Sequence, residues 1–199
     1  MVWKLLRWLR FVWWRISELI YRIKALSGSQ IANGELQLGK TVFFHVPARV
    51  DGVGRVLIAD FCHLGYRQAP RLGNGEVLLQ ARNPDAVISV GQRTWLSNNV
   101  SIVACQQIMI GKDCLIGDGV TIFDSDFHEL SPEKRHMSGG EVEKVIIRDN
   151  VWLGSRVIVL KGVTVGEGSV VAPMSVVTKD IPANCVAAGT PAKVIRQLV

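Results

Sequence analysis

Residues 145–182 read VIIRDNVWLGSRVIVLKGVTVGEGSVVAPMSVVTKDIP, and a branched aliphatic residue recurs there at every sixth position. These leading positions are Ile147, Leu153, Val159, Val165, Val171 and Val177. A small or apolar residue follows each of them by four positions, at Val151, Val157, Val163, Ser169, Ser175 and Ile181. Helices repeat their buried positions about every 3.6 residues and strands every second residue, so neither period explains a repeat of six. Short strands joined by turns do explain it, and three such units predict a triangular coil whose turns stack through parallel strands.

The six-residue period also runs through the middle of the chain, with interruptions. An aliphatic residue followed by glycine recurs at Leu38-Gly39, Leu64-Gly65, Val90-Gly91, Ile110-Gly111 and Ile116-Gly117. Residues 66–76 break the pattern with a proline and two glycines, which predicts a loop. Ile102 and Ile110 are separated by two positions more than the period allows, so we expect a two-residue insertion to bulge from that coil.

The period stops at residues 128–144, which read HELSPEKRHMSGGEVEK. This stretch is polar and charged, and it contains a proline and a pair of glycines. A long segment without periodicity is uncommon inside a regular domain and is often functional. We therefore expect an excursion loop that leaves the coil at His128 and returns at Lys144.

The composition predicts one domain with an uneven distribution of charge. The chain has 199 residues, of which 48% are hydrophobic, and a net charge of +6. Residues 1–26 carry six basic residues and one acidic residue, so the remaining body is close to neutral. Nucleic-acid-binding domains carry a basic patch on the folded body, so we expect no nucleic-acid partner. The cysteines have no close pair and no metal-like spacing, so we expect reduced thiols in a cytoplasmic protein.

Residues 1–26 predict an amphipathic helix that carries four tryptophans between Trp3 and Trp14. One face of a helical wheel carries Leu5, Leu9, Val12, Ile16, Leu19, Ile20 and Ile23. The opposite face carries Lys4, Arg7, Arg15, Glu18 and Arg22. The charged residues leave no apolar run long enough for a signal peptide or a spanning helix. The helix either lies in the interface of an anionic membrane, which we favour, or packs against the body or a sister subunit.

These observations divide the chain into three parts. Residues 1–26 are the helix, residues 27–35 a linker with glycines near both ends, and residues 36–199 the repeat domain. If the helix binds lipid, the protein is peripheral on the cytoplasmic face of the inner membrane.

Three sequence features together resemble the left-handed β-helix acyltransferases. They are the hexapeptide repeats, the DSDFH sequence at residues 124–128 and the closing AAGTPAKVIR at residues 187–196. The resemblance covers residues 36–197 and is closest to sugar O-acetyltransferases, which include maltose, galactoside, nodulation-factor and surface-polysaccharide enzymes. It implies an all-β fold, a left-handed parallel β-helix, preceded here by an α-helix. It also implies acetyl-CoA as cosubstrate, no metal, and a homotrimer with sites at the subunit junctions. The left hand comes from the resemblance alone, because parallel crossovers are otherwise right-handed.

The resemblance implies that His128 is the catalytic base. Transfer of an acetyl group from a thioester to an alcohol needs a group that removes the hydroxyl proton, and imidazole, with an ordinary pKa of about 6.5, suits this role. Family members place such a histidine at the start of the excursion loop, where His128 stands. Asp126, Glu129 or a backbone carbonyl group would orient the ring, and the sequence leaves these three open.

The resemblance also implies two sets of binding residues. Those near the acceptor are Asn98 or its neighbour Asn99, Asp126 and Trp152. Those that contact the acetyl-CoA donor are Ser155, Pro173, Thr178, Lys179, Lys193 and Arg196. Ser155 and Pro173 are separated by three hexapeptides, one full coil, so we expect them at the same place on adjacent coils. Lysine and arginine suit the phosphates of coenzyme A.

His45 and His63 are also separated by one full coil, so we expect them to stack. Some β-helix relatives are carbonic anhydrases that hold zinc through three histidines. This chain lacks the required histidine cluster in the middle of the coil, so we expect no metal site.

The sequence therefore predicts an acetyl-CoA-dependent O-acetyltransferase that acts on a sugar hydroxyl of a surface polysaccharide or its lipid-linked precursor. Two alternatives stay open. One is N-acetylation of an amino sugar or an antibiotic, and the other is a non-catalytic β-helix scaffold.

Overall fold

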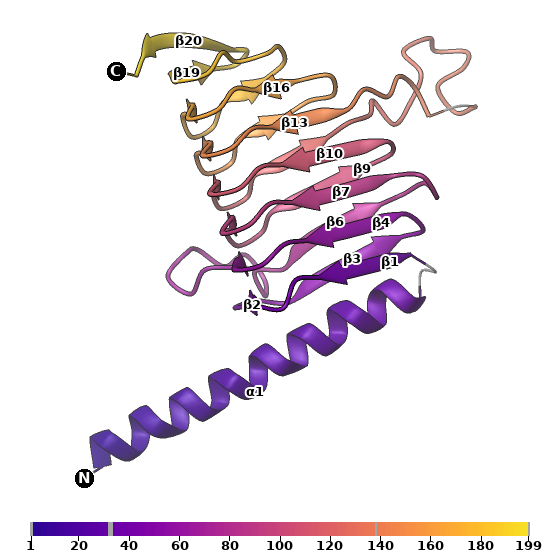
Figure 1. The fold of residues 1–199 in the computed structure, drawn as a ribbon. Coiled ribbons are helices and arrows are strands. Elements are labelled where there is room, and N and C mark those ends of the chain that lie inside the picture. The colour runs from indigo at the N-terminus through magenta and orange to yellow at the C-terminus, as the bar shows by residue number, and fades with distance from the viewer. Residues whose placement is uncertain (1, 32–33, 138, 199) are drawn as a thin grey trace.

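The computed structural model of the protein describes residues 2–31, 34–137 and 139–198. Within the helix it describes the side chains of residues 6, 8, 9, 12, 13 and 15–26. The helix α1 (Val2–Ile31) is followed by short strands that wind into a triangular prism (Figure 1). In Figure 1 the front strands run from right to left while the coil rises from β1, so the winding is left-handed as expected.

Each side of the prism is one sheet of stacked strands. Sheet A contains β1 (Glu35–Leu38), β4 (Arg55–Ile58), β7 (Val87–Val90), β10 (Gln107–Ile110), β13 (Val145–Ile147) and β16 (Thr164–Val165). Sheet B contains β2 (Val42–Phe44), β5 (Cys62–Leu64), β8 (Trp95–Leu96), β11 (Leu115–Ile116), β14 (Trp152–Leu153), β17 (Val170–Val171), β19 (Cys185–Gly189) and β20 (Ala192–Gln197). Sheet C contains β3 (Ala48–Gly52), β6 (Val77–Ala81), β9 (Ser101–Ala104), β12 (Thr121–Phe123), β15 (Ile158–Val159) and β18 (Val176–Val177). All pairs are parallel except β19 with β20, which closes the prism at the C-terminal end.

The core consists of the residues that the six-residue period selected. Every leading aliphatic residue between Ile147 and Val177 is at most 1% exposed. Val159 pairs in register with Ile122 on one neighbouring coil and with Val177 on the other. The alternation of strand and turn thus directs one column of side chains inward from each sheet, and the predicted register is confirmed.

The predicted interruptions lie between strands. Residues 66–76 connect β5 to β6, and the excursion loop connects β12 to β13. The two-residue insertion forms the turn between β9 and β10. All three leave the prism at a corner, which preserves the stacking of the coils.

The boundary between helix and repeat domain differs from the expectation. The helix continues to Ile31 and β1 begins at Glu35, so residues 27–31 of the expected linker are helical. A single glycine in a helix costs only about 1 kcal/mol, and here Gly28 does not end the helix. Residues 32 and 33 lie outside the described residues, as do the side chains of Lys4, Leu5 and Arg7.

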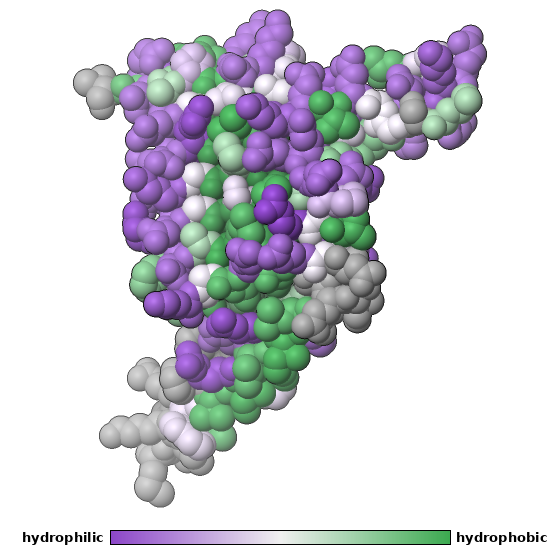
Figure 2. Space-filling model, turned by 45° about the vertical axis from the view of Figure 1, so that its right-hand side comes forward, coloured by the Kyte–Doolittle hydropathy of each residue, from purple (hydrophilic) through white to green (hydrophobic). Residues whose placement is uncertain are grey.

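The helix packs across the N-terminal end of the prism with only part of its surface. Ala25 is fully buried, and Tyr21 packs against the core. The apolar face identified from the sequence points away from the prism, with Leu19 58% and Ile23 55% exposed (Figure 2). Trp13, at the margin of this face, is 72% exposed. The described residues include no helix that is both long and apolar enough to cross a membrane.

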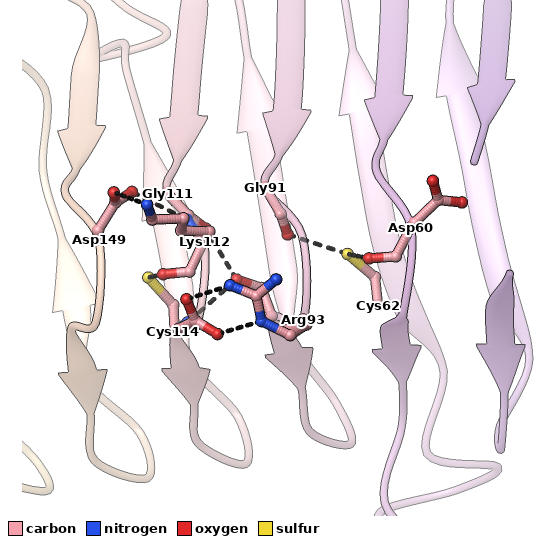
Figure 3. Close-up of polar contacts among 10 residues, drawn as sticks. Asp60, Cys62, Gly91, Arg93, Gly111, Lys112, Cys114 and Asp149 are labelled. Carbon is pink, nitrogen blue, oxygen red and sulfur yellow. Dashed lines mark hydrogen bonds and ion pairs between the residues drawn. The ribbon is translucent and has the colours of Figure 1, made fainter. Parts of the chain in front are cut away.

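The corner between sheets A and B is held by contacts among its own residues (Figure 3). The guanidinium group of Arg93 donates to both carboxylate oxygens of Asp113, at 2.6 and 2.7 Å. Lys112 lies 3.5 Å from a carboxylate oxygen of Asp149. Toward the N-terminal end of the same corner, the Cys62 thiol donates to the carbonyl oxygen of Gly91, and burial raises the pKa of this thiol to about 11. The thiol stays protonated at neutral pH, as expected for a structural cysteine.

Candidate functional site

The excursion loop leaves the prism at the corner between sheets C and A through a narrow neck. Ser125 forms an isolated antiparallel bridge with Val142. The amide of Asp126 donates to the carbonyl oxygen of Glu141 at 3.0 Å. The outgoing and returning segments therefore form a two-stranded stem that carries the loop.

A buried carboxylate anchors the base of this stem. Asp124 is fully buried, and its two carboxylate oxygens accept backbone N–H groups of Cys105, Gln106 and Gln107, each at 2.7 Å. These amides belong to the inserted turn between β9 and β10 and to the first residue of β10. A buried carboxylate needs such partners, so the insertion and the loop fix each other. The insertion was predicted, but its link to Asp124 was not.

The imidazole of His128 is oriented by its own loop. Its Nδ1 atom lies 3.0 Å from the backbone carbonyl oxygen of Arg135. A carbonyl oxygen only accepts hydrogen bonds, so Nδ1 carries the proton in the neutral ring. The lone pair then resides on Nε2. A backbone carbonyl is one of the three orienting groups that the sequence left open.

Asn98 and Asn99 hold another loop in place. Asn98 is fully buried, and its Oδ1 atom accepts a hydrogen bond from the backbone amide of Tyr66 at 2.8 Å. Its Nδ2 atom donates to the carbonyl oxygens of Tyr66, Ala69 and Pro70. The Nδ2 of Asn99 donates to Pro70 and to Asp118. Residues 66–76 thus enclose the amide of Asn98 and give it a structural role, and its contact with an acceptor stays a prediction.

The other two acceptor candidates lie in different surroundings. Asp126 is in the stem, with a carboxylate oxygen 3.5 Å from Nζ of Lys161. Trp152 is 51% exposed on the outer face of sheet B. It borders a groove of about 500 Å³ lined by Tyr66, Trp95, Ser97, Leu115, Ile116, Gly117 and Trp152. Trp95, Leu115 and Trp152 are neighbours in register. Each directly precedes a leading core residue, so aligning those positions would have revealed this apolar column.

The donor candidates divide between two edges of the prism and its end. Ser155 and Pro173 lie on adjacent coils at the corner between sheets B and C, where the amide of Met174 donates to the Ser155 carbonyl at 3.0 Å. Thr178 and Lys179 follow β18 at the corner between sheets C and A. Those two therefore share an edge with the excursion loop of His128, whereas Ser155 and Pro173 do not.

The remaining donor candidates lie at the C-terminal end. Lys193 and Arg196 are exposed on β20, which runs antiparallel to β19 at the end of sheet B. Within one chain the donor candidates therefore lie at two corners and at the C-terminal end, and they do not form a single site.

His45 and His63 stack as the spacing predicted. His45 Nε2 lies 2.9 Å from His63 Nδ1, and the His63 ring stacks on Trp95 with 3.8 Å between centroids. Burial and the neighbouring His63 lower the pKa of His45 to about 4. Among the described residues, no group of three or more histidine, cysteine or acidic side chains is placed to hold a metal ion.

Comparison with known proteins finds similar chains among acetyltransferases. Residues 144–179 match the family described as "Bacterial transferase hexapeptide (six repeats)". Galactoside O-acetyltransferases of Lactococcus lactis and Escherichia coli are 41% and 40% identical over 111 and 113 residues. Each match covers 56% of this chain, which spans only 53% and 54% of those relatives.

Two solved structures extend the comparison. The polySia-specific acetyltransferase NeuO superposes with a TM-score of 0.69 at 28% identity, over 84% of this chain and 73% of NeuO. A galactoside acetyltransferase in complex with coenzyme A has a TM-score of 0.54 at 38% identity, over 56% of each chain. In its triangular coil and its matching repeats, this chain is similar to these hexapeptide-repeat acetyltransferases, and its fold is the left-handed parallel β-helix expected from the sequence.

Proposed function

We propose that this protein transfers an acetyl group from acetyl-CoA to a sugar hydroxyl, with His128 as the general base. The observation that carries the proposal is the hydrogen bond from Nδ1 of His128 to the Arg135 carbonyl, which presents a basic Nε2 on the excursion loop. The relatives support acetyl transfer, since those cited are acetyltransferases of galactosides or polysialic acid. A galactoside acetyltransferase bound to coenzyme A supports the donor.

The reaction needs only the imidazole and a bound thioester. Nε2 accepts the hydroxyl proton while the sugar oxygen attacks the thioester carbonyl carbon. The tetrahedral intermediate collapses, the carbon–sulfur bond breaks, and the imidazolium returns the proton to the thiolate of coenzyme A. The products are an O-acetyl sugar and free coenzyme A, and the imidazole is regenerated.

The proposed assembly is a homotrimer with one site at each junction. Ser155 and Pro173 lie at one corner of the prism, and His128 and Lys179 lie at another. If three prisms pack side by side, the corner between sheets B and C of one subunit faces the corner between sheets C and A of the next. This arrangement would join the two halves of the donor site and cover the apolar column of Trp95, Leu115 and Trp152. Lys193 and Arg196 would meet the phosphates at the C-terminal end.

The proposed location is the surface of an anionic membrane, and the proposed acceptor is a membrane-proximal glycan or its lipid-linked precursor. The support is the exposed apolar face of α1, which includes Ile16 and Leu19 and has the exposed Trp13 at its margin. Arg15, which the helical wheel places on the charged face, is also exposed. Tryptophan at headgroup depth and arginine toward anionic lipid are typical of interfacial helices.

Release of free thiol from acetyl-CoA in the presence of sugars tests the proposed activity. Methyl galactoside, maltose and sialic acid oligomers are suitable first acceptors, and galactosamine and glucosamine distinguish N-acetylation. We expect acceptor-dependent thiol release and an ester-linked acetyl group in the product. The proposal would be contradicted if none of these hydroxyl acceptors stimulated thiol release, or if the only product were an amide.

A further inference from the structure

Lys161 joins the two strands of the stem that carries His128. It lies at the corner between sheets C and A, on the coil that follows the excursion loop, and its side chain is only 18% exposed. Its Nζ atom is 2.8 Å from a carboxylate oxygen of Glu141 and 3.4 Å from one of Glu143, both on the returning segment. The same Nζ is 3.5 Å from a carboxylate oxygen of Asp126 on the outgoing segment. We propose that Lys161 is a positioning residue, whose ammonium group holds the stem closed and thereby fixes the imidazole of His128.

The backbone couples the stem directly to His128. Asp126 precedes His128 by two positions, and Gly140 precedes Glu141. A Cβ at Gly140, whose φ is +71°, would overlap the carbonyl oxygen of His128, so the returning segment packs closely against the backbone of the base. Any separation of the two segments near Lys161 therefore displaces His128. A displacement of about 1 Å is enough to cost a large factor in a positioned reaction.

A neutral side chain at position 161 could not balance the three carboxylates that surround the ammonium group of Lys161. Three carboxylates converge on one ammonium group, and without it they would repel each other across the stem. The hydrogen bond from Lys161 lowers the pKa of Glu141, so this carboxylate is charged at neutral pH. Glu141 and Glu143 are 72% and 59% exposed, and single pairs of such exposed groups contribute little to stability. We therefore expect Lys161 to act on the geometry of the loop more than on global stability.

Steady-state kinetics distinguish a positioning role of Lys161 from a contact with a phosphate of acetyl-CoA on the same edge of the prism. Lys161 and Lys179 are separated by one full coil, at the corner where a donor phosphate is proposed. A phosphate contact would affect the KM for acetyl-CoA, whereas a positioning role affects kcat.

The test compares full-length Lys161→Met with Lys161→Arg and with Lys112→Met, a control that removes the ammonium group paired with Asp149 on another edge. Tryptic cleavage in the excursion loop, at Lys134 and Arg135, is measured first because it needs no acceptor. We expect cleavage of Lys161→Met to be at least about five-fold faster, at an unchanged melting temperature. The arginine variant and the control should match the wild type. Equal cleavage rates for Lys161→Met and the wild type would overturn the inference.

Kinetics with acetyl-CoA and a sugar accepted by the wild type give the second readout. This part rests on the proposed function of His128. We expect Lys161→Met to lower kcat by about 10- to 100-fold with little change in the KM for acetyl-CoA. Adding Glu141→Gln and Glu143→Gln should recover part of the loss, because the repulsion is removed. Unchanged kcat, or a raised KM alone, would overturn the inference. An inactive His128→Ala variant beside a Lys161→Met variant with wild-type turnover would contradict only the role of Lys161. An active His128→Ala variant would contradict the proposed function.

Discussion

The Nδ1 atom of His128 lies 3.0 Å from the backbone carbonyl oxygen of Arg135, which is later in the same loop. The loop that carries the proposed base therefore also selects its tautomer. A carboxylate could orient an imidazole equally well, but it would place a negative charge beside the ring. A neutral carbonyl group orients the ring without adding a charge.

The donor assignment predicts a change in KM. Lys179→Ala and Arg196→Ala should raise the KM for acetyl-CoA with little effect on kcat, because both side chains would hold phosphates far from the reacting carbon. Steady-state kinetics at varied acetyl-CoA measure both constants. A reduced kcat at saturating donor would show that these residues act nearer the chemistry.

Asn98 is predicted to stabilise the loop of residues 66–76. Asn98→Ala removes the donor for three carbonyl groups and the acceptor for the Tyr66 amide, so the free energy of unfolding should fall by about 1–3 kcal/mol. Urea denaturation measures this loss, and trypsin should cut faster at Arg67 and Arg71. Asn83→Ala, which loses a single bond to the Cys105 carbonyl, is the matched control. If Asn98→Ala keeps its stability and loses only affinity for the sugar, the acceptor role expected from the sequence is restored.

The core was predictable because burial in this fold follows a strict period. The leading aliphatic residues fix which side chains point inward, and the coil of three hexapeptides fixes which of them are neighbours. Ser155 and Pro173 could therefore be placed on adjacent coils from spacing alone. The number of hexapeptides per coil also determines that the donor candidates lie at two different corners, although we did not predict this division.

The contacts of the loops were not predictable from the period. The enclosure of Asn98 depends on how residues 66–76 fold back, and the contact of Lys161 depends on where the excursion loop returns. Neither path is set by a local pattern. The end of the helix was misplaced for a related reason, since Gly28 was interpreted by its propensity while the helix continues to Ile31 across the end of the prism.

The register predicts that Val159→Asp unfolds the repeat domain. Val159 is fully buried between Ile122 and Val177, so the variant would bury a carboxylate without a partner. Ile158 is the preceding residue of the same strand and is only partly buried, and Ile158→Asp is the control. Circular dichroism and size-exclusion chromatography should show an unfolded or aggregated Val159→Asp protein and a folded control. A folded Val159→Asp protein would show that the register is displaced.

The helix offers a way to separate its two surfaces. Trp13→Gln with Leu19→Gln changes the exposed face and leaves Tyr21 and Ala25 in contact with the core. We expect the wild type to sediment with vesicles that contain phosphatidylglycerol, and high salt to weaken this because charges are screened over about 10 Å at 0.1 M. The double variant should stay in the supernatant with an unchanged melting temperature and molecular mass. A lower molecular mass with unchanged vesicle binding would instead place this face against a sister subunit.

The most direct test of the account is the turnover of His128→Ala. A positioned base contributes about 10²–10⁴-fold, so kcat for acetyl transfer from acetyl-CoA to an accepted sugar should fall by that factor. Isothermal titration with coenzyme A and the melting temperature should match the wild type, which excludes loss of the fold or of donor binding. A His128→Ala protein that keeps most of its turnover would contradict the central claim that the imidazole on the excursion loop removes the hydroxyl proton.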